Sequence, residues 1–402
     1  MVSNLFPPYF LGGYEILCSQ VCEYFSRFGH EIFVLTSDHG TEAKKTEEDI
    51  CLPGYKDIAR RLKLYLPFNH PPRLLRRKRH QIGRYNRGIT QAMIQEAKPD
   101  VIFIWSQLRL TLGPARAAQD SRIPVVYTFN DEHPAGYLPA PFAFSPRQIF
   151  RYVADHWIYP DITTLGLDFP YSTCISKCLK RNLLAKGFPI DSSRVIYQGI
   201  PIERFPCKEE PGSIHGPARV LYVGQLHPYK GVHTLIDACH LVNAHAPQSI
   251  MLTIVGDGPE EYKKMLAQKS KEGPTPIDFT GRKPHESLPK IYREHDIFVF
   301  PSSWQEPFGL THLEAMASGT TVISTTEGGH GEFLKNGENA LVFPKENGTE
   351  LARCLEQIIR SPIESERLAC QARKMAAQEF SLERYARELE KFLQDIIAQR
   401  KK

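Results

Sequence analysis

Residues 298–324 read FVFPSSWQEPFGLTHLEAMASGTTVIS, and this stretch predicts a strand, a loop, a helix and a second strand in succession. The apolar run 298–303 is typical of a buried strand. Pro307 and Gly309 then favour the start of a helix over residues 310–318. A helix that follows a buried strand in this way is typical of a parallel sheet covered by helices.

Two carboxylates flank the predicted helix start. Glu306 lies on the loop, and Glu314 lies on a helix face of apolar and small residues, where an ionised carboxylate needs hydrogen-bond donors such as sugar hydroxyls. The first turn also offers unpaired N–H groups, and Gly309 has no side chain to keep a phosphate away. These features suit a sugar linked to a diphosphate. The alternative is a favourable charge at the helix start and a buried acid with protein partners.

This stretch closely resembles the Glu-x7-Glu signature of family 4 retaining glycosyltransferases, and the rest of the chain resembles that family in order over nearly all of its 402 residues. The resemblance implies an α/β protein of the GT-B fold, with two doubly wound Rossmann-like domains that face a central cleft. It further implies that Glu306 contacts hydroxyls of the donor sugar and that Glu314 holds the ribose. The amides of Phe308, Gly309 and Leu310 would meet the sugar and the phosphate.

Alternating apolar runs and helical segments predict two such domains. Residues 1–205 form the expected acceptor-side domain and 219–380 the expected nucleotide-sugar-binding domain. The polar, Pro- and Gly-rich stretch 206–218 is the predicted linker, and 381–402 is a helix that crosses back to the first domain in similar proteins. The predicted strands of the second domain are 219–223, 250–255, 277–280, 296–300 and 321–324.

The first strand is short in this sequence. Members of the family usually carry several more apolar residues before the position of Met1, and we therefore expect a truncated start.

Two loops of the second domain resemble parts of the family's donor site. Gly224 and Gln225 follow its first strand, and Lys230 stands where the family uses a lysine to neutralise the donor diphosphate. Relatives commonly carry an arginine at the position of Gln225, so one cation is missing here. Gly281 and Arg282 resemble the loop that passes the nucleobase, and Arg282 is the candidate to replace the missing charge. The alternative for Lys230 is an exposed lysine in a turn.

The acceptor side departs from the family's pattern. Gly12-Gly13 resembles the loop whose amides face the phosphates or the sugar. Where many relatives carry a histidine close to the reacting sugar, this sequence has Asn130, which cannot act as a general base. Asp131 and His133 are the candidate bases; alternatively the donor phosphate receives the acceptor proton, or all three residues are polar loop residues.

Composition limits the setting in which the protein acts. With 42% hydrophobic and 24% charged residues, the chain has the composition of an ordinary soluble protein. Its nine cysteines form no Cys-x-x-Cys pair, which favours free thiols in a reducing cytoplasm. The sequence contains no apolar run of about 18 residues and no signal-like start. We expect a cytoplasmic protein that is at most peripheral to the inner face of a membrane.

The net charge of +5 is concentrated in one helix-compatible segment. Its cations are Arg73, Arg76, Arg77, Lys78, Arg79, Arg84 and Arg87. Such a patch is either a solvated surface helix or a contact with an anionic membrane surface or acceptor, and nucleic acid is the least favoured partner.

The sequence thus predicts a retaining glycosyltransferase of the kind used in polysaccharide biosynthesis. It would move a sugar from a nucleotide-diphosphate sugar to an acceptor hydroxyl on a glycan, a lipid or a small molecule. Lys230 and the helix-start amides would stabilise the leaving diphosphate, so that neither a metal nor a further cofactor is required. The alternatives are a catalytically silent sugar-nucleotide-binding protein, suggested by Gln225 and Asn130, and a nucleotide-sugar epimerase on the same scaffold. A nicotinamide oxidoreductase is disfavoured, because no full Gly-x-Gly-x-x-Gly opens either domain.

Overall fold

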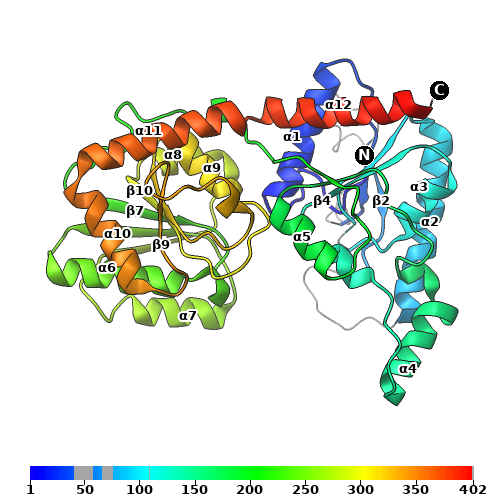
Figure 1. Ribbon diagram of the computed structural model, residues 1–402, viewed down its shortest axis with the longest axis horizontal. Helices are drawn as coiled ribbons and strands as arrows, with labels where there is room; N and C mark the ends of the chain where they lie inside the picture. Colours follow the sequence, from blue (N-terminus) through cyan, green and yellow to red (C-terminus); the bar gives the residue numbers. More distant parts are fainter. Residues whose placement is uncertain (40–57, 66–75, 108, 401–402) are drawn as a thin grey trace. The chain divides into compact units, whose positions relative to one another are not determined.

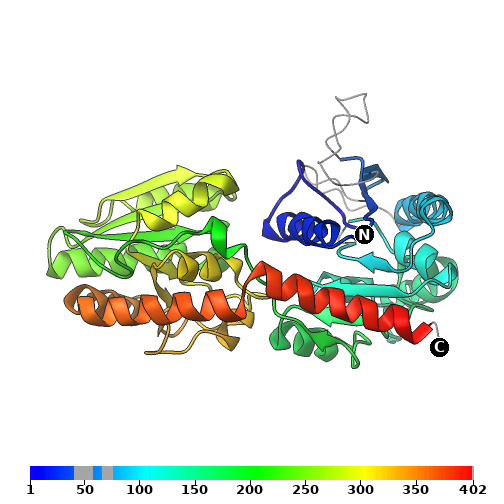
Figure 2. The same ribbon diagram turned by 90° about the horizontal axis from the view of Figure 1, so that it is seen from above.

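The computed structural model describes residues 1–39, 58–65, 76–107 and 109–400, and the chain divides into two compact units (Figures 1 and 2). Unit 1 comprises Met1–Ile196 with Ala386–Lys402, and unit 2 comprises Tyr197–Tyr385. No helix in the described part of the chain is both long and apolar enough to cross a bilayer.

Unit 2 contains a six-stranded parallel sheet with the order β12-β11-β10-β7-β8-β9. Its strands are β7 (Ala218–Val223), β8 (Ile250–Val255), β9 (Ile277–Gly281), β10 (Ile297–Phe300), β11 (Thr321–Ser324) and β12 (Leu341–Val342). The strands β10 and β11 are buried at every position, because helices cover both faces of the sheet. The five predicted strands therefore all occur, and the structure adds β12.

The helices of unit 2 form two layers, one on each face of the sheet (Figure 1). One layer contains α6 (Val232–His245), α7 (Glu260–Lys269) and α10 (Gly348–Arg360); the other contains α8 (Leu288–Arg293), α9 (Leu310–Ala317) and α11 (Pro362–Glu379). Helix α9 follows β10 through the loop 301–309, as the sequence pattern predicts. This arrangement puts the start of α9 at the carboxyl edge of the sheet.

The segment 206–218, predicted as a linker, belongs to unit 2, and the boundary between the units falls earlier, at Tyr197. Lys208 Nζ lies 3.2 Å from Asp296 Oδ1, and its N–H donates to the carbonyl of Ser318. The N–H of Gly212 donates to the carbonyl of Gly319. These bonds hold the segment on unit 2, which its Pro- and Gly-rich composition does not indicate.

Unit 1 contains the parallel strands β3-β4-β5-β6 and the parallel pair β1-β2. Val2 bridges both Leu35 of β1 and Ile104 of β3, so the first residues of the chain lie between these two strands. The strands are β1 (Val34–Ser37), β2 (Ile58–Leu62), β3 (Ile102–Ile104), β4 (Val125–Phe129), β5 (Ser172–Cys174) and β6 (Arg194–Val195).

The helices of unit 1 are α1 (Gly13–Arg27), α2 (Arg76–Ala97), α3 (Gly113–Asp120), α4 (Pro146–Val153), α5 (Lys177–Ala185) and, from Ala386 onward, α12 (Leu382–Arg400). Helix α12 packs on this unit through several side chains. Glu390 Oε1 lies 2.6 Å from His30 Nε2, and the guanidinium of Arg194 lies 5.0 Å from the centroid of the Phe392 ring.

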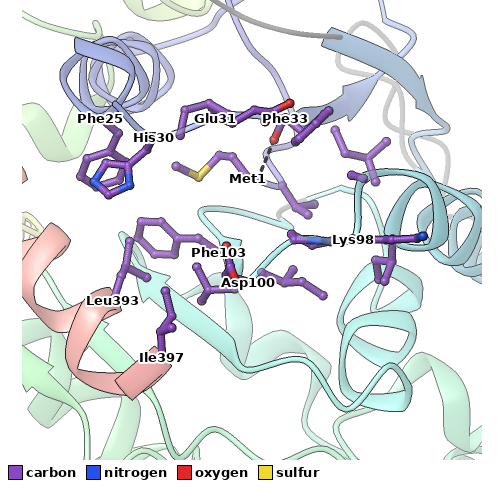
Figure 3. Close-up of a pocket in the computed structure, with 18 of the residues that line it drawn as sticks. Met1, Phe25, His30, Glu31, Phe33, Lys98, Asp100, Phe103, Leu393 and Ile397 are labelled. Carbon is purple, nitrogen blue, oxygen red and sulfur yellow. Dashed lines mark hydrogen bonds between the residues drawn. The ribbon is translucent and has the colours of Figure 1, made fainter. Parts of the chain in front are cut away.

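A cavity of about 290 Å³ lies at the amino end of the strands of unit 1 (Figure 3). The amino group of Met1 donates to the carbonyl of Phe33 at 2.7 Å, and burial lowers the pKa of this amino group. Apolar side chains that include Phe103, Leu393 and Ile397 line the cavity. None of the predicted site residues is among the lining residues, because those residues follow the carboxyl ends of the strands.

Candidate active site

The two predicted site residues Lys230 and Glu306 form an ion pair in unit 2. Lys230 ends the 3₁₀ turn η6 (Pro228–Lys230) after β7, and Glu306 lies on the loop after β10. Because β7 and β10 are parallel neighbours, their carboxyl ends meet at one edge of the sheet. Lys230 Nζ lies 2.6 Å from Glu306 Oε1 and 2.8 Å from Oε2, with the two side chains only 13% and 11% exposed. The hydroxyl of Ser302 donates to the same carboxylate at 2.8 Å.

Gly328 fixes the backbone of Glu306. The N–H of Glu306 donates to the carbonyl of Glu327, and the carbonyl of Glu306 accepts from the N–H of Gly329 at 2.6 Å. Gly328 has φ +115°, and a Cβ there would lie 2.4 Å from both the backbone N and O of Glu306. Only glycine permits this approach, so the position of the carboxylate depends on Gly328.

The start of α9 is a second place where glycine is required. Gly309 has φ +123°, and a Cβ there would lie 2.8 Å from His312 Nδ1 and 3.0 Å from His330 Cβ. The ring of Phe308 is buried and anchors the loop. The N–H groups of Leu310 and Thr311 in the first turn have no acceptor within a helix of this geometry, whereas the N–H of His312 donates to the carbonyl of Gly309. The backbone here is therefore suited to an anionic ligand.

His312 and His330 stack next to this helix start, with ring centroids 4.7 Å apart. Burial lowers the pKa of both imidazoles, that of His330 to about 4, and the charge of Lys230 adds to this effect. His312 Nε2 lies 2.9 Å from the hydroxyl of Ser324. Both rings are thus uncharged at neutral pH. The sequence pattern did not indicate this pair, because burial and stacking of residues 18 positions apart leave no local signal.

Glu314 lies on α9 and is buried with protein donors. Tyr292 donates its hydroxyl to Oε2 at 2.9 Å, and His285 Nε2 lies 3.4 Å from Oε1. The hydrogen bond to Glu314 raises the pKa of His285. A carboxylate accepts about four hydrogen bonds, so two protein donors leave capacity for ligand hydroxyls. Tyr292 and His285 lie 22 and 29 positions before Glu314, so no local sequence pattern indicates either contact.

The Tyr292→Phe variant tests the support of Glu314. We expect the affinity for a nucleotide sugar to fall by about ten- to a hundredfold, because hydrogen bonds to charged groups contribute roughly 1.5–3 kcal/mol. Turnover at saturating donor should change much less. The matched control is Tyr262→Phe, which removes a similar contact, 2.9 Å from His233 Nδ1. Isothermal calorimetry of both variants gives the comparison, and equal losses of affinity would contradict a specific role for Tyr292.

Gly224 and Gln225 follow β7 directly. The N–H of Gly224 donates to the carbonyl of Val255, and a Cβ on Gly256 would lie 1.8 Å from the carbonyl oxygen of Gly224. Close packing of the ends of β7 and β8 thus requires glycine at 256. Gln225 is exposed, and its carbonyl accepts from the Tyr222 hydroxyl at 2.8 Å.

Gly281 is the last residue of β9, and Arg282 follows it. Gly281 has φ +69° and open space where a Cβ would lie. Hydrogen bonds from Lys263 and from the backbone of Gly258 lower the pKa of Asp257, and the charge of Arg282 adds a smaller effect. Because the carbonyl of Asp257 accepts from Leu226, the residue after Gln225, Arg282 and Gln225 share one edge of the sheet.

In unit 1, Gly12 and Gly13 stand at the start of α1. The N–H of Gly12 donates to Glu15 Oε2 at 2.9 Å, and burial raises the pKa of Glu15. Gly12 has an extended backbone with φ −148°, and the nearest atom to a Cβ would be 3.7 Å away. The fold therefore does not require glycine at position 12, in contrast to Gly328.

Asn130, Asp131 and His133 follow β4. Asn130 Nδ2 donates to the carbonyl of Trp105 at 3.1 Å. Asp131 Oδ1 accepts from the N–H of His133, and burial raises the pKa of Asp131. Burial, together with the charges of Arg79 and Arg109, lowers the pKa of His133 to about 4. Both candidate bases thus lie on one short segment of unit 1, with His133 uncharged at neutral pH.

The predicted basic segment Arg73–Arg87 is described from Arg76 onward, where α2 begins, and Arg73 lies outside the described residues. Arg76 Nε lies 2.9 Å from Asp155 Oδ1, and Arg87 pairs with Asp120. The other described cations on this part of the helix are Arg77, Lys78, Arg79 and Arg84.

The fold and the site first define the structural class of the protein. HepE of Anabaena in complex with UDP is similar in structure over 98% of each chain, with 19% identity and a TM-score of 0.69. This similarity, together with the parallel sheet and helix layers of each unit, identifies an α/β protein of the GT-B fold, as the sequence predicts.

The family follows from two matches along the chain. The description "Glycosyltransferase Family 4" matches residues 11–204, and "Glycosyl transferases group 1" matches residues 205–375. The chain belongs to this glycosyltransferase family, and the sequence-based prediction of the family is confirmed.

Two curated relatives each match about half of the chain. Spore coat protein SA of Bacillus subtilis is 30% identical over 218 residues, which are 49% of this chain and 57% of that protein. Glycogen synthase of Mycobacterium tuberculosis is 32% identical over 187 residues, which are 46% of this chain and 44% of that protein. The chain thus spans about half the length of these two relatives.

Proposed function

We propose that the protein is a retaining glycosyltransferase that uses a nucleotide-diphosphate sugar and needs no metal ion. The observation that carries this proposal is the buried pair of Lys230 and Glu306 beside the glycine-opened start of α9. A cation and first-turn amides at one sheet edge suit a leaving diphosphate, and a carboxylate next to them suits sugar hydroxyls. Family membership supports the same reading.

Lys230 would contact the diphosphate without leaving Glu306. An ammonium group has three donors, and two of them face the Glu306 carboxylate before the donor binds. As the bond between the anomeric carbon and the phosphate oxygen breaks, negative charge grows on the diphosphate. Lys230 and the amides of Phe308, Gly309 and Leu310 would stabilise that charge, while Glu306 and Glu314 accept hydrogen bonds from the sugar and the ribose. Gly224, Gln225, Gly281 and Arg282 would line the remainder of the donor site.

The acceptor hydroxyl must lose its proton, and Asp131 suits this role better than His133. Burial raises the pKa of Asp131 and so strengthens its carboxylate as a base, whereas burial lowers the pKa of His133 to about 4 and weakens its imidazole as a base. The donor phosphate is the alternative acceptor of the proton. The amides of Gly12 and Gly13 would face the donor from unit 1.

The proposed acceptor is a glycan, a lipid or a small molecule, and the proposed setting is the cytoplasm. All eight cysteines in the described residues are free, as a reducing compartment favours. The cations of Arg73–Arg87 support contact with an anionic membrane surface.

A donor screen tests the proposal. HepE has been crystallised with UDP-glucose, so this nucleotide sugar is the first to try here, followed by other bases and sugars. We expect one donor to raise the melting temperature and to be transferred to an acceptor in the presence of EDTA, with the anomeric configuration retained in the product NMR spectrum. Asp131→Asn in the same assay separates a carboxylate base from the donor phosphate.

Three results would overturn the proposal in different ways. If no donor raised the melting temperature, the protein would have no donor site of the proposed kind. Stabilisation without transfer would favour a silent binding protein, for which the exposed Gln225 and the engaged amide of Asn130 are the supporting observations. A sugar with altered configuration, formed without acceptor, would favour the epimerase.

A further inference from the structure

Residues 142–158 of unit 1 carry an unusual density of exposed apolar side chains. Phe144, Phe150 and Trp157 are 90%, 64% and 76% exposed. The other exposed members of this group are Phe142, Ile149, Val153 and Ile158. Single exposed apolar residues are normal on a protein surface, but a contiguous group marks a surface that contacts something apolar. We call these seven residues the aromatic patch.

The aromatic patch lies on a short element that packs little against the rest of the unit. Helix α4 has no buried residue, and the one-turn helix η3 (Ala154–Ile158) follows it directly. Figure 1 shows α4 set apart from the sheet of unit 1. Phe142 contacts Phe144 of the patch and the neighbouring half-buried Tyr152 edge to face, with ring centroids 5.4 and 5.5 Å apart. Residues 142–158 therefore have a defined structure, but their apolar side chains remain on the surface.

The charges next to the aromatic patch are of one sign. Arg147 and Arg151 are exposed on α4 itself. Asp155, the acid of residues 142–158, is buried and bonded to Arg76 and to the N–H of Ala140. The surface that α4 presents is thus apolar and basic.

Helix α2 extends this basic surface. The pair of Arg76 with Asp155, and His80 Nδ1 at 2.7 Å from Asp161 Oδ2, fix the first turns of α2 beside η3 and the following turn η4 (Pro160–Ile162). Arg77, Lys78 and Arg84 are exposed on these turns. None of these three cations forms an ion pair with an acid in the described part of the chain. Helix α2 itself contains no acid before Glu96. The aromatic patch therefore lies beside a helix on which Arg76 and Arg87 are paired with acids, while Arg77, Lys78 and Arg84 have no acid partner among the described residues.

We infer that the aromatic patch inserts into the interfacial layer of an anionic lipid bilayer, with Arg77, Lys78, Arg84, Arg147 and Arg151 against the lipid headgroups. Tryptophan and phenylalanine side chains favour this layer, because it lies at the boundary between the polar headgroups and the apolar acyl chains. Each basic residue near an anionic surface adds to the attraction, and salt weakens this contribution by screening. An eight-residue helix is far too short to span the bilayer, so the contact is peripheral.

A bilayer suits this surface better than a second copy of the chain. A two-fold self-contact would bring the same cations of both copies together, and like charges repel in an interface. The inference deepens the membrane contact proposed above, but it does not rest on transferase activity, because it is measured without donor.

Flotation with vesicles tests the inference. We expect the full-length protein to bind vesicles of phosphatidylcholine mixed with phosphatidylglycerol, and to bind phosphatidylcholine vesicles weakly or not at all. The triple variant Phe144→Ser, Phe150→Ser, Trp157→Ser should reduce the partition coefficient by about tenfold or more. A matched variant replaces three exposed apolar residues of unit 2, Leu241, Met251 and Ile363, by serine and should bind as the parent does.

Fluorescence provides a second, residue-specific measurement. The three tryptophans are Trp105, Trp157 and Trp304, and Trp105 is fully buried. In a Trp304→Phe background, addition of the mixed vesicles should shift the emission of Trp157 to shorter wavelength, and salt should reverse the shift by screening the cations.

Three outcomes would overturn the inference. One is binding to anionic vesicles that the triple serine variant retains. Another is an unshifted Trp157 emission in the presence of bound vesicles. A third is a concentration-dependent dimer, seen by analytical ultracentrifugation, that the triple variant abolishes while the parent binds no vesicles.

Discussion

The Glu306→Gln variant is expected to lose sugar transfer by on the order of 10²–10³-fold in kcat/KM, the size of effect seen when one preorganised charge or donor is removed from an active site. The amide keeps the shape of the side chain but removes the negative charge that faces Lys230 Nζ at 2.6 and 2.8 Å. It also removes acceptor capacity for sugar hydroxyls. Steady-state kinetics with the donor found in the screen measures the loss.

This variant should also be less stable, because it leaves Lys230 buried without its counter-charge. Removing one partner of a buried pair destabilises a protein by about 3–5 kcal/mol, less where solvent reaches the pair. The matched control on the neighbouring loop is Glu327→Gln. Glu327 lies 3.4 Å from Lys345 Nζ on the surface, where an ion pair contributes roughly 0–1 kcal/mol. Glu327→Gln should therefore retain stability and activity.

A double variant separates catalysis from stability. Lys230→Met combined with Glu306→Gln removes both charges, so we expect much of the lost stability to return, as measured by urea unfolding. Activity should stay low, because the stabilisation of the diphosphate is also gone. Recovery of both stability and activity in the double variant would show that the pair serves the fold alone.

The second large effect is expected for Gly328→Ala. Its Cβ would lie 2.4 Å from the backbone N and O of Glu306, and φ +115° is strained for any residue with a Cβ. Both the loop after β10 and the strand-like contact between Glu306 and Gly328 must then move. We expect a loss of about 3 kcal/mol or more in the free energy of unfolding, in the range of severe local mechanisms. Transfer should fall as well, because the carboxylate moves with its backbone.

Gly337→Ala is the control for this prediction. Gly337 has φ +70°, but nothing lies within 4 Å of the place where a Cβ would stand. The substitution should therefore cost only the strain of a left-handed backbone, about 1–2 kcal/mol, and leave activity unchanged. Urea unfolding of both variants gives the two free energies. Equal losses of unfolding free energy would contradict a specific contribution of the contact between Gly328 and Glu306 to stability.

Local sequence pattern was sufficient for the strands and the helix start of unit 2. Buried parallel strands have apolar side chains on both faces, so runs such as 297–300 stand out from their surroundings. Pro307 and Gly309 also predicted where α9 begins, because backbone geometry at a helix start is a local property. The unit boundary was not predictable in this way. The bond between Lys208 and Asp296 joins segments 88 positions apart, and composition carries no signal of it.

The sequence by itself determined which residue types stand at the carboxyl edge of the unit 2 sheet, because strand ends and the turns after them are encoded locally. Only the tertiary structure decided how those residues are partnered. Lys230 and Glu306 lie 76 positions apart and meet because β7 and β10 are neighbours in the sheet. Tyr292 and His285 reach Glu314 by the same kind of packing. Burial, charge pairing and shifted pKa values depend on neighbours brought together by folding, and for that reason a linear pattern identifies the residues but not the site that they form.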